Sequence, residues 1–227
     1  MKRSEINALI DKAKTLFQHN QIRLPPFAFW KPEEWLKKGA EADEIRNNRL
    51  GWDLTDFGSG CFPAVGLLLF TIRNGNLGDP ANKKHYAEKV MLVEEGQVTP
   101  FHFHWLKTED IINRGGGNLV VELFNSDADD NFTQEPIQVS CDGVKRTVEP
   151  GGSVVLRPGE SITLVPRLYH KFYGQNRAGR VIVGEVSSVN DDASDNRFKE
   201  PAGRFPKIDE DAPPLHHLCH EYPRAQS

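Results

Sequence analysis

Two histidines, His102 and His104, are separated by a single residue in the stretch GQVTPFHFHWLKTED. Side chains alternate between the two faces of a β-strand, so on a strand both imidazoles share one face and can point at one ion. Phe101, Phe103 and Trp105 then share the opposite face, which suits packing against an apolar layer. The pair alone leaves two interpretations open, a metal-binding strand or two histidines hydrogen-bonded in a polar interior.

Two further residues could complete a metal site. Glu109 follows His104 by five residues, which fits the start of the next strand after a tight turn, and His170 lies in a second strand-like segment, TLVPRLYHKFYG. Three imidazoles and one carboxylate suit Mn, Fe, Co, Ni or Zn better than Ca or Mg. Four protein ligands on an octahedral ion leave two adjacent positions open, whereas a structural zinc site is more often tetrahedral and recruits cysteine.

The spacing of these residues resembles the first motif of the cupin superfamily. Five residues separate Gly96 from His102, one separates His102 from His104, four separate His104 from Glu109, and six separate Glu109 from Gly116. Each of these positions matches the motif.

The second cupin motif is matched more loosely. Gly152 is its first glycine, Pro158 and Gly159 form its turn, and His170 is its histidine, although the histidine comes late and Gly174 stands where asparagine is usual. Together the two motifs cover roughly residues 85–185. The resemblance implies a cupin β-barrel with one divalent metal per subunit, held by His102, His104, Glu109 and His170.

A narrower resemblance extends over most of the chain. The segments RSEINALIDKAKTLF, PPFAFW, WDLTDFGSG, HFHWLKTEDIINRGGG and, above all, GEVSSVNDDASDNRF look like those of the bacterial D-lyxose isomerases. The resemblance implies an enzyme that interconverts D-lyxose and D-xylulose, and also D-mannose and D-fructose. It implies Mn²⁺ as the metal, with Co²⁺, Fe²⁺, Ni²⁺ and Zn²⁺ as alternatives, and a homodimer.

Aldose–ketose isomerisation through an enediolate needs a base for the carbon-bound proton and an acid for the oxygens. Lys107 and Glu185 are the candidates. Lys107 lies between His104 and Glu109, and Glu185 interrupts the apolar run VIVGEV, where a carboxylate is costly unless it has a partner. Glu109 is a third candidate for proton transfer. The alternative interpretations are a solvated turn lysine and an outward-facing strand glutamate.

The polar stretch SVNDDASDNRF follows Glu185. On residue types alone a solvated loop with Asx turns is favoured. The resemblance favours sugar-binding roles for Asp192 and Arg197 at the mouth of the barrel.

Two other sequence clusters resemble functional sites. LHHLCHEYP near the end of the chain is rich in histidine, but it lacks a second ligand pair at zinc-finger spacing. RGGGN resembles a phosphate-binding loop, but no GK[ST] follows it, so a tight turn is the better interpretation.

Helices are predicted only near the N-terminus. The apolar residues of SEINALIDKAKTLFQHN recur at three- and four-residue spacing, and Ser4 is the predicted N-cap. KPEEWLKKG is predicted to form a short second helix.

From about residue 60, short runs rich in β-branched and aromatic residues alternate with Gly, Pro, Asn and Asp. CDGV is a predicted hairpin turn. We therefore predict one mainly-β domain with a jelly-roll barrel. It comprises a helical or irregular extension (1–60), a barrel core (61–190) and a C-terminal wrap (191–227).

Composition excludes several other classes. Lys+Arg number 28 against Asp+Glu 32, so no basic excess marks a nucleic-acid surface. The longest apolar runs are too short to cross a bilayer and the N-terminus does not resemble a signal peptide, so we expect no membrane partner and a cytoplasmic location. The three cysteines, which are odd in number and far apart, are predicted to be reduced thiols.

Two other functions share the predicted metal site. A cupin dioxygenase would bind oxygen and substrate at the open positions, and a non-catalytic cupin would only bind a sugar. The proton-transfer candidates favour the isomerase, which needs acid and base groups, whereas a dioxygenase could work in an apolar pocket.

Overall fold

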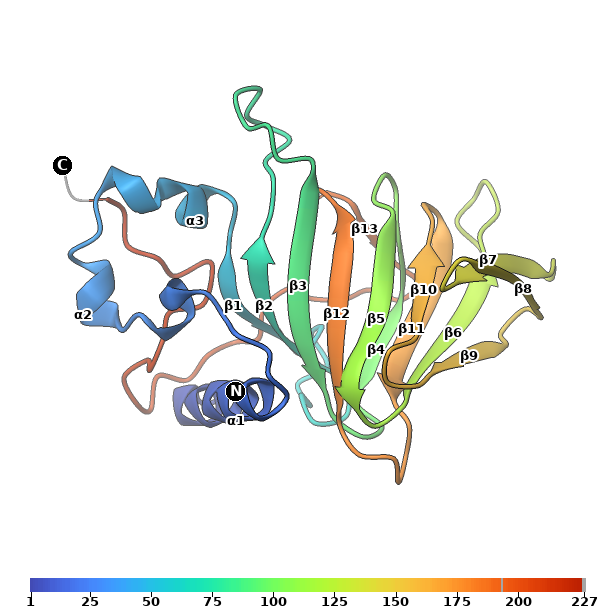
Figure 1. Ribbon diagram of the computed structural model, residues 1–227, viewed down its shortest axis with the longest axis horizontal. Coiled ribbons are helices and arrows are strands. Elements are labelled where there is room, and N and C mark those ends of the chain that lie inside the picture. Colours follow the sequence, from blue (N-terminus) through green and yellow to red (C-terminus); the bar gives the residue numbers. More distant parts are fainter. Residues whose placement is uncertain (193, 226–227) are drawn as a thin grey trace.

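The computed structural model describes residues 1–192 and 194–225 as two antiparallel β-sheets with helices on one side (Figure 1). The helices are α1 (Arg3–His19), α2 (Pro32–Trp35) and α3 (Asp43–Asn47), with 3-10 helices at Pro26–Phe29 and Ala40–Ala42. None of the described helices is long and apolar enough to span a membrane.

The larger sheet has eight strands, and neighbouring strands pair antiparallel. Their spatial order is β1 (Gly51–Thr55), β2 (Leu67–Arg73), β3 (Tyr86–Val93), β12 (Val181–Ser188), β5 (Glu109–Gly116), β10 (Ser161–Leu164), β7 (Ile137–Cys141) and β8 (Val144–Val148).

The smaller sheet has five strands, and it faces the larger one across the core. Their order is β13 (Asn196–Phe198), β4 (Val98–His104), β11 (Leu168–Gly174), β6 (Leu119–Asn125) and β9 (Ser153–Leu156). The predicted mainly-β two-sheet barrel is therefore confirmed.

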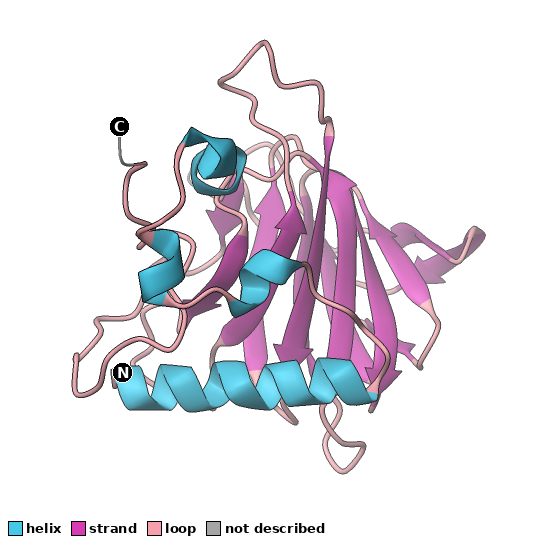
Figure 2. Ribbon diagram, turned by 60° about the vertical axis from the view of Figure 1, so that its left-hand side comes forward, coloured by secondary structure: helices cyan, strands magenta, loops and turns pink. Residues whose placement is uncertain are grey.

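The apolar run of β2 is explained by two cores. Leu67 and Leu69 point between the sheets, whereas Leu68 and Phe70 point outward into a second cluster beneath α1. Figure 2 shows α1 running across the outer face of the larger sheet. A strand covered on both faces needs apolar residues at every position, which is why this stretch lacks alternation.

The predicted boundaries need three corrections. β1 lies before residue 61 and β13 after residue 190, because each adds an edge strand to a sheet whose other strands lie inside that range. Ser4 is not the N-cap, because α1 begins at Arg3 and the Ser4 hydroxyl instead donates to Asp211. The segment KPEEWLKKG forms only the single turn of α2.

Other local predictions hold. Asp142 and Gly143 both have positive φ in the β7–β8 hairpin, as a two-residue turn of this kind requires. The cysteines Cys61, Cys141 and Cys219 are free thiols. The glycine-rich segment, by contrast, differs from the predicted tight turn, because Arg114, Gly115 and Gly116 belong to the end of β5 and only Gly117 and Asn118 join it to β6.

Candidate active site

Four buried side chains converge in the interior of the barrel. His102 and His104 lie on β4, Glu109 is the first residue of β5, and His170 lies on β11 directly opposite His102. One ligand atom from each lies within 4.8 Å of those from the others. The strand predicted from the two histidines therefore presents both to the interior, together with the predicted Glu109 and His170.

The tautomer of each histidine follows from its neighbours. Nδ1 faces a backbone carbonyl oxygen at 2.8 Å in His102, 3.3 Å in His104 and 3.0 Å in His170. A carbonyl oxygen only accepts, so Nδ1 carries the proton in each ring. Every Nε2 is then left with its lone pair directed into the cluster.

This arrangement fits a cation. Nε2 of His102 and Nε2 of His170 lie 3.0 Å apart, and His104 Nε2 is buried with no hydrogen-bond donor, only Glu109 Oε1 at 3.3 Å. Facing lone pairs repel unless a positive ion lies between them. Fixing each ring through its Nδ1–H is the usual arrangement for histidine ligands.

The electrostatics keep the two β4 rings in the ligating form. Burial lowers the pKa of His102 well below its usual value, and the neighbouring His170 adds to this. Burial and then Lys107 lower the pKa of His104. Both imidazoles are therefore neutral near pH 7, the form that binds metals.

The histidine-rich segment LHHLCHEYP makes no second site. Nδ1 of His216 faces the Trp30 carbonyl oxygen at 2.9 Å, and its Nε2 contacts Lys14 Nζ at 3.1 Å. Within residues 1–192 and 194–225, no further group of three or more His, Cys, Asp or Glu side chains converges as the interior four do.

Next to the metal-ligand candidates lies a buried chain of charges. Lys107 Nζ lies 2.7 Å from Glu109 Oε2 and 3.0 Å from Glu185 Oε1. Burial alone would lower the pKa of Lys107, but the two carboxylates outweigh it and raise the pKa. Burial would likewise raise the pKa of Glu185, but Lys107 and Lys89 lower it. The lysine is therefore cationic and the glutamate anionic.

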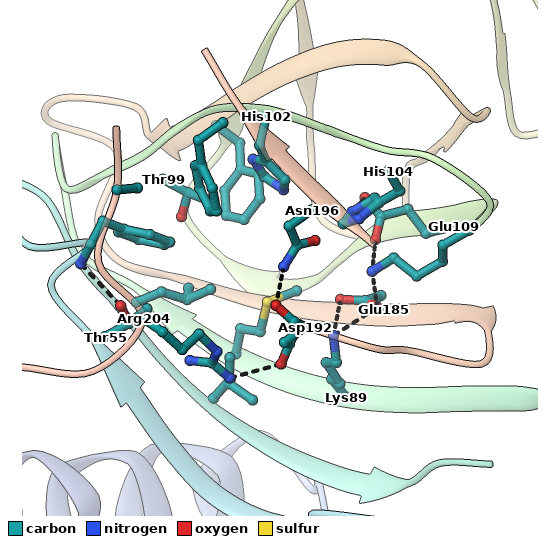
Figure 3. Close-up of a pocket in the computed structure, with 18 of the residues that line it drawn as sticks. Thr55, Lys89, Thr99, His102, His104, Glu109, Glu185, Asp192, Asn196 and Arg204 are labelled. Carbon is teal, nitrogen blue, oxygen red and sulfur yellow. Dashed lines mark hydrogen bonds and ion pairs between the residues drawn. The ribbon is translucent and has the colours of Figure 1, made fainter. Parts of the chain in front are cut away.

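Lys89 also belongs to this row of buried charges, and it was not predicted from the sequence. It lies on β3 directly opposite Glu185 on β12, with its Nζ 3.1 Å from Glu185 Oε1 (Figure 3). The signal was present, since alternation places Lys89 on the same strand face as Ala87, Met91 and Val93. A lysine among inward-facing apolar residues requires a buried partner.

The side chains of this site, except His170, border a cavity of about 250 Å³. Its polar side carries His102, His104 and Glu109 together with the lysine–glutamate chain, and its other side is apolar. The lining residues that matter below are His102, His104, Lys107, Glu109, Glu185, Asp192 and Arg204. A cavity of this size, with a few converging polar groups, suits a small polar ligand.

Of the two predicted sugar-binding residues, Asp192 lines the cavity but Arg197 does not. On β13, Asn196 and Phe198 face the cavity, so the side chain between them points away, and Arg197 pairs with Asp130 at 3.3 Å. The arginine in the cavity is Arg204, whose Nη2 lies 2.7 Å from Asp192 Oδ2.

Arg204 comes from the C-terminal segment, which has no periodic pattern, so the sequence carried no signal for it. Burial would raise the pKa of Asp192, but Lys89, Arg204 and Lys107 outweigh it and lower the pKa. The aspartate is therefore an anionic acceptor that the cavity keeps charged.

Solved structures support the fold. The chain is similar to L-ribose isomerase from Cellulomonas parahominis with L-ribose, with a TM-score of 0.62 and 17% identity over 92% of this chain and 98% of that one. It is also similar to L-ribose isomerase from Geodermatophilus obscurus, with a TM-score of 0.60, 16% identity and the same coverage. At this identity the likeness concerns the cupin-type fold.

Two relatives share a much higher sequence identity with this chain. The chain is 48% identical to a D-lyxose/D-mannose isomerase of Serratia proteamaculans over 225 residues, 99% of both chains. It is 48% identical to a D-lyxose/D-mannose isomerase of Escherichia coli O157:H7 over 223 residues, 98% of both. The family model described as D-lyxose isomerase matches residues 1–222. The chain therefore belongs to the D-lyxose isomerase family and is a sugar isomerase.

Proposed function

We propose that the protein is a metal-dependent aldose–ketose isomerase that interconverts D-lyxose and D-xylulose, and also D-mannose and D-fructose. One observation carries the proposal. Three histidine lone pairs and a carboxylate converge beside a buried lysine–glutamate chain, and all of these residues except His170 line one cavity. The names of the two relatives support these sugars. The dioxygenase and the non-catalytic cupin lose their basis, because the family is one of isomerases.

The metal of this proposal is one divalent ion per subunit, held by His102, His104, Glu109 and His170. The mixed nitrogen and oxygen donors favour Mn²⁺ or a neighbouring transition metal over Ca²⁺ and Mg²⁺. Such an ion supplies Lewis acidity towards the two neighbouring oxygens of the sugar.

Glu185 and Lys107 divide the proton chemistry by their charges. Glu185 is anionic and lines the cavity, so it is the base that accepts the carbon-bound proton. Lys107 is cationic, and its positive charge stabilises the sugar oxygen on which negative charge grows. Glu109 accepts from Lys107 and so fixes the ammonium beside the metal-ligand cluster.

Asp192 binds the hydroxyl groups of the sugar that do not react. Its carboxylate, held by Arg204, accepts hydrogen bonds and leaves the arginine free to donate. The homodimer and the cytoplasmic location stay predictions drawn from the resemblance and the composition.

The test is an anaerobic sugar panel. The protein is stripped of metal, reloaded with Mn²⁺ and given D-lyxose, D-mannose, D-xylose and L-ribose under argon. We expect D-xylulose from D-lyxose and D-fructose from D-mannose, with less conversion of D-xylose and L-ribose. No ketose from any aldose, or oxygen uptake in air in its place, overturns the proposal.

A further inference from the structure

We propose that Asn190 and Asn74 are positioning residues that hold the two buried lysines against Glu185. Oδ1 of Asn190 accepts hydrogen bonds from Lys89 Nζ at 2.7 Å and from Lys107 Nζ at 3.2 Å. Asn190 does not line the reaction cavity, so it acts through the lysines. The inference rests on the proposed roles of Lys107 and Glu185.

The hydrogen-bond inventory of Lys107 shows what this contact achieves. An ammonium group has three N–H donors, and those of Lys107 meet Glu109 Oε2, Glu185 Oε1 and Asn190 Oδ1. The amide oxygen thus completes the set and fixes the rotation of the group. Because both its lone pairs are used, the same oxygen sets the separation of Lys107 from Lys89.

The chemical type of this acceptor also matters. Two ammonium groups already face the carboxylates of Glu109 and Glu185, and Asp192 lies nearby and is hydrogen-bonded to the Asn190 side chain. A neutral amide oxygen orients the lysines without adding a further negative charge.

Asn74 holds Asn190 in place. Its side-chain amide makes two hydrogen bonds to the backbone of Asn190, from Asn190 N–H to Asn74 Oδ1 at 3.0 Å and from Asn74 Nδ2 to the Asn190 carbonyl at 2.9 Å. Asn74 is buried and directly follows β2, whereas Asn190 follows β12. The loop that contains Asn190 is therefore anchored, through the paired bonds, to the residue that directly follows β2.

Neither asparagine lines the reaction cavity, so we expect their loss to affect the chemical step and not sugar binding. With Mn²⁺-loaded protein and D-lyxose, we expect Asn190→Ala to lower kcat at least tenfold, with KM within twofold of the wild-type value. Asn190→Asp keeps an acceptor oxygen but adds a negative charge beside Asp192, so its kcat should lie between that of Asn190→Ala and that of the wild type.

A double-mutant cycle tests whether Asn74 acts through Asn190. We expect Asn74→Ala to lower kcat about as much as Asn190→Ala, and the double variant to lose no more than a further twofold. Asn113→Ala is the matched control, because Asn113 is also buried and its side chain bonds only to backbone groups, at Gly115, Gly117 and Leu156. Its melting temperature should fall while kcat and KM stay within twofold.

A readout without turnover separates this inference from the proposed function. Buried, hydrogen-bonded ammonium groups exchange slowly enough for proton–nitrogen NMR of ¹⁵N-lysine-labelled, metal-free protein. We expect Asn190→Ala and Asn74→Ala to shift or abolish the signals of Lys89 and Lys107, whereas Asn113→Ala leaves them in place. If no aldose is converted by the wild type, the proposed function fails and the NMR result decides the inference alone. Unchanged ammonium signals, or multiplicative kcat losses in the cycle, would overturn it.

Discussion

Glu185 lies between two ammonium groups, and these contacts set the charges of the proposed base and the proposed acid. The carboxylate of Glu185 stays ionised because Lys107 and Lys89 offset its burial. The ammonium of Lys107 stays protonated because two carboxylates face it. Base and acid are therefore both charged before a sugar arrives, so that neither requires a separate proton-transfer step to become active.

The substitution Glu185→Gln tests the base. The amide keeps the shape of the side chain but cannot accept the carbon-bound proton, so we expect kcat to fall about 10²-fold or more. Metal content should stay at the wild-type value, because Glu185 is not one of the converging donors. Glu122→Gln is the control, since Glu122 pairs with Lys171 away from the cavity. A Glu185→Gln enzyme with near-normal kcat would remove the residue from the mechanism.

The buried histidines of β4 make the metal-free protein sensitive to acid. His102 and His104 have pKa values lowered in the fold, so the unfolded chain binds more protons below its own histidine pKa of about 6.5. The free energy of unfolding is unaffected above that pH and falls as pH decreases through it, by up to roughly 1.4 kcal/mol per pH unit for each histidine.

The check is urea unfolding of the metal-free protein between pH 7.5 and about 5.5. His102→Gln removes one titrating ring, so its unfolding free energy should fall less steeply with pH than that of the wild type. Because the other histidines are common to both proteins, the difference isolates His102. Parallel curves for the two proteins would contradict the lowered pKa.

For single residues, the sequence was most informative where residue type and spacing along the chain both matched a known motif. His102, His104 and Glu109 follow from one strand and the next, and His170 from a second motif. Arg204 could not be found, because an irregular segment carries no period that shows which way a side chain points. Arg197 was predicted to bind sugar at the barrel mouth but does not line the cavity, because the short strand β13, which turns its side chain away, was not foreseen.

At the scale of elements, strand pairing brings the site together. β4 and β11 are neighbours in the smaller sheet and supply the three histidines, whereas β3, β12 and β5 are consecutive in the larger sheet and supply Lys89, Glu185 and Glu109. Lys107 lies in the connection between β4 and β5. The alternation of β-strands was predictable from the sequence, but the pairing of β12 with both β3 and β5 was not, because such long-range neighbours leave no local pattern.

Gly116, the last glycine of the first cupin motif, has a backbone role that can be tested. Its φ is 88°, and a Cβ there would lie 2.2 Å from the carbonyl oxygen of Arg180, so the β5–β12 pairing must shift. Gly143 in the β7–β8 turn also has positive φ, but a Cβ there meets nothing within 4 Å.

We therefore expect Gly116→Ala to lower the unfolding free energy by about 3 kcal/mol or more, and Gly143→Ala by about 1 kcal/mol. Urea unfolding of both variants provides the measurement. Equal losses at the two positions would show that backbone conformation alone, and not the close approach, makes Gly116 necessary.

At the scale of the whole molecule, the chain after β13 returns to the helices (Figure 1). Asp209 pairs with the backbone at the start of the chain, and Arg3 contacts two carboxylates, with its Nη2 2.7 Å from Glu210 Oε1 and 2.5 Å from Glu221 Oε1. This segment carries Arg204 into the cavity, so the ends of the fold help to close the site.

Arg3→Met should therefore weaken the attachment of the C-terminal segment to α1 and lower the free energy of unfolding. The arginine is 2% exposed, but Glu210 is 57% exposed and solvent screens that pair, so we expect a loss of about 1–3 kcal/mol in the unfolding free energy. Arg23→Met, at an exposed position, should change it by no more than about 0.5 kcal/mol. Similar unfolding midpoints for the two variants would contradict a stabilising role of the Arg3 contacts.

The central claim is that four converging side chains hold one metal that isomerisation requires. The most direct test is a titration of metal-stripped protein with Mn²⁺ under argon, with D-xylulose formation from D-lyxose measured at each addition. We predict that activity rises linearly and reaches its plateau at one Mn²⁺ per chain, and that His104→Ala shows neither metal binding nor activity. Full activity in the stripped protein, or undiminished activity in His104→Ala, would contradict the account.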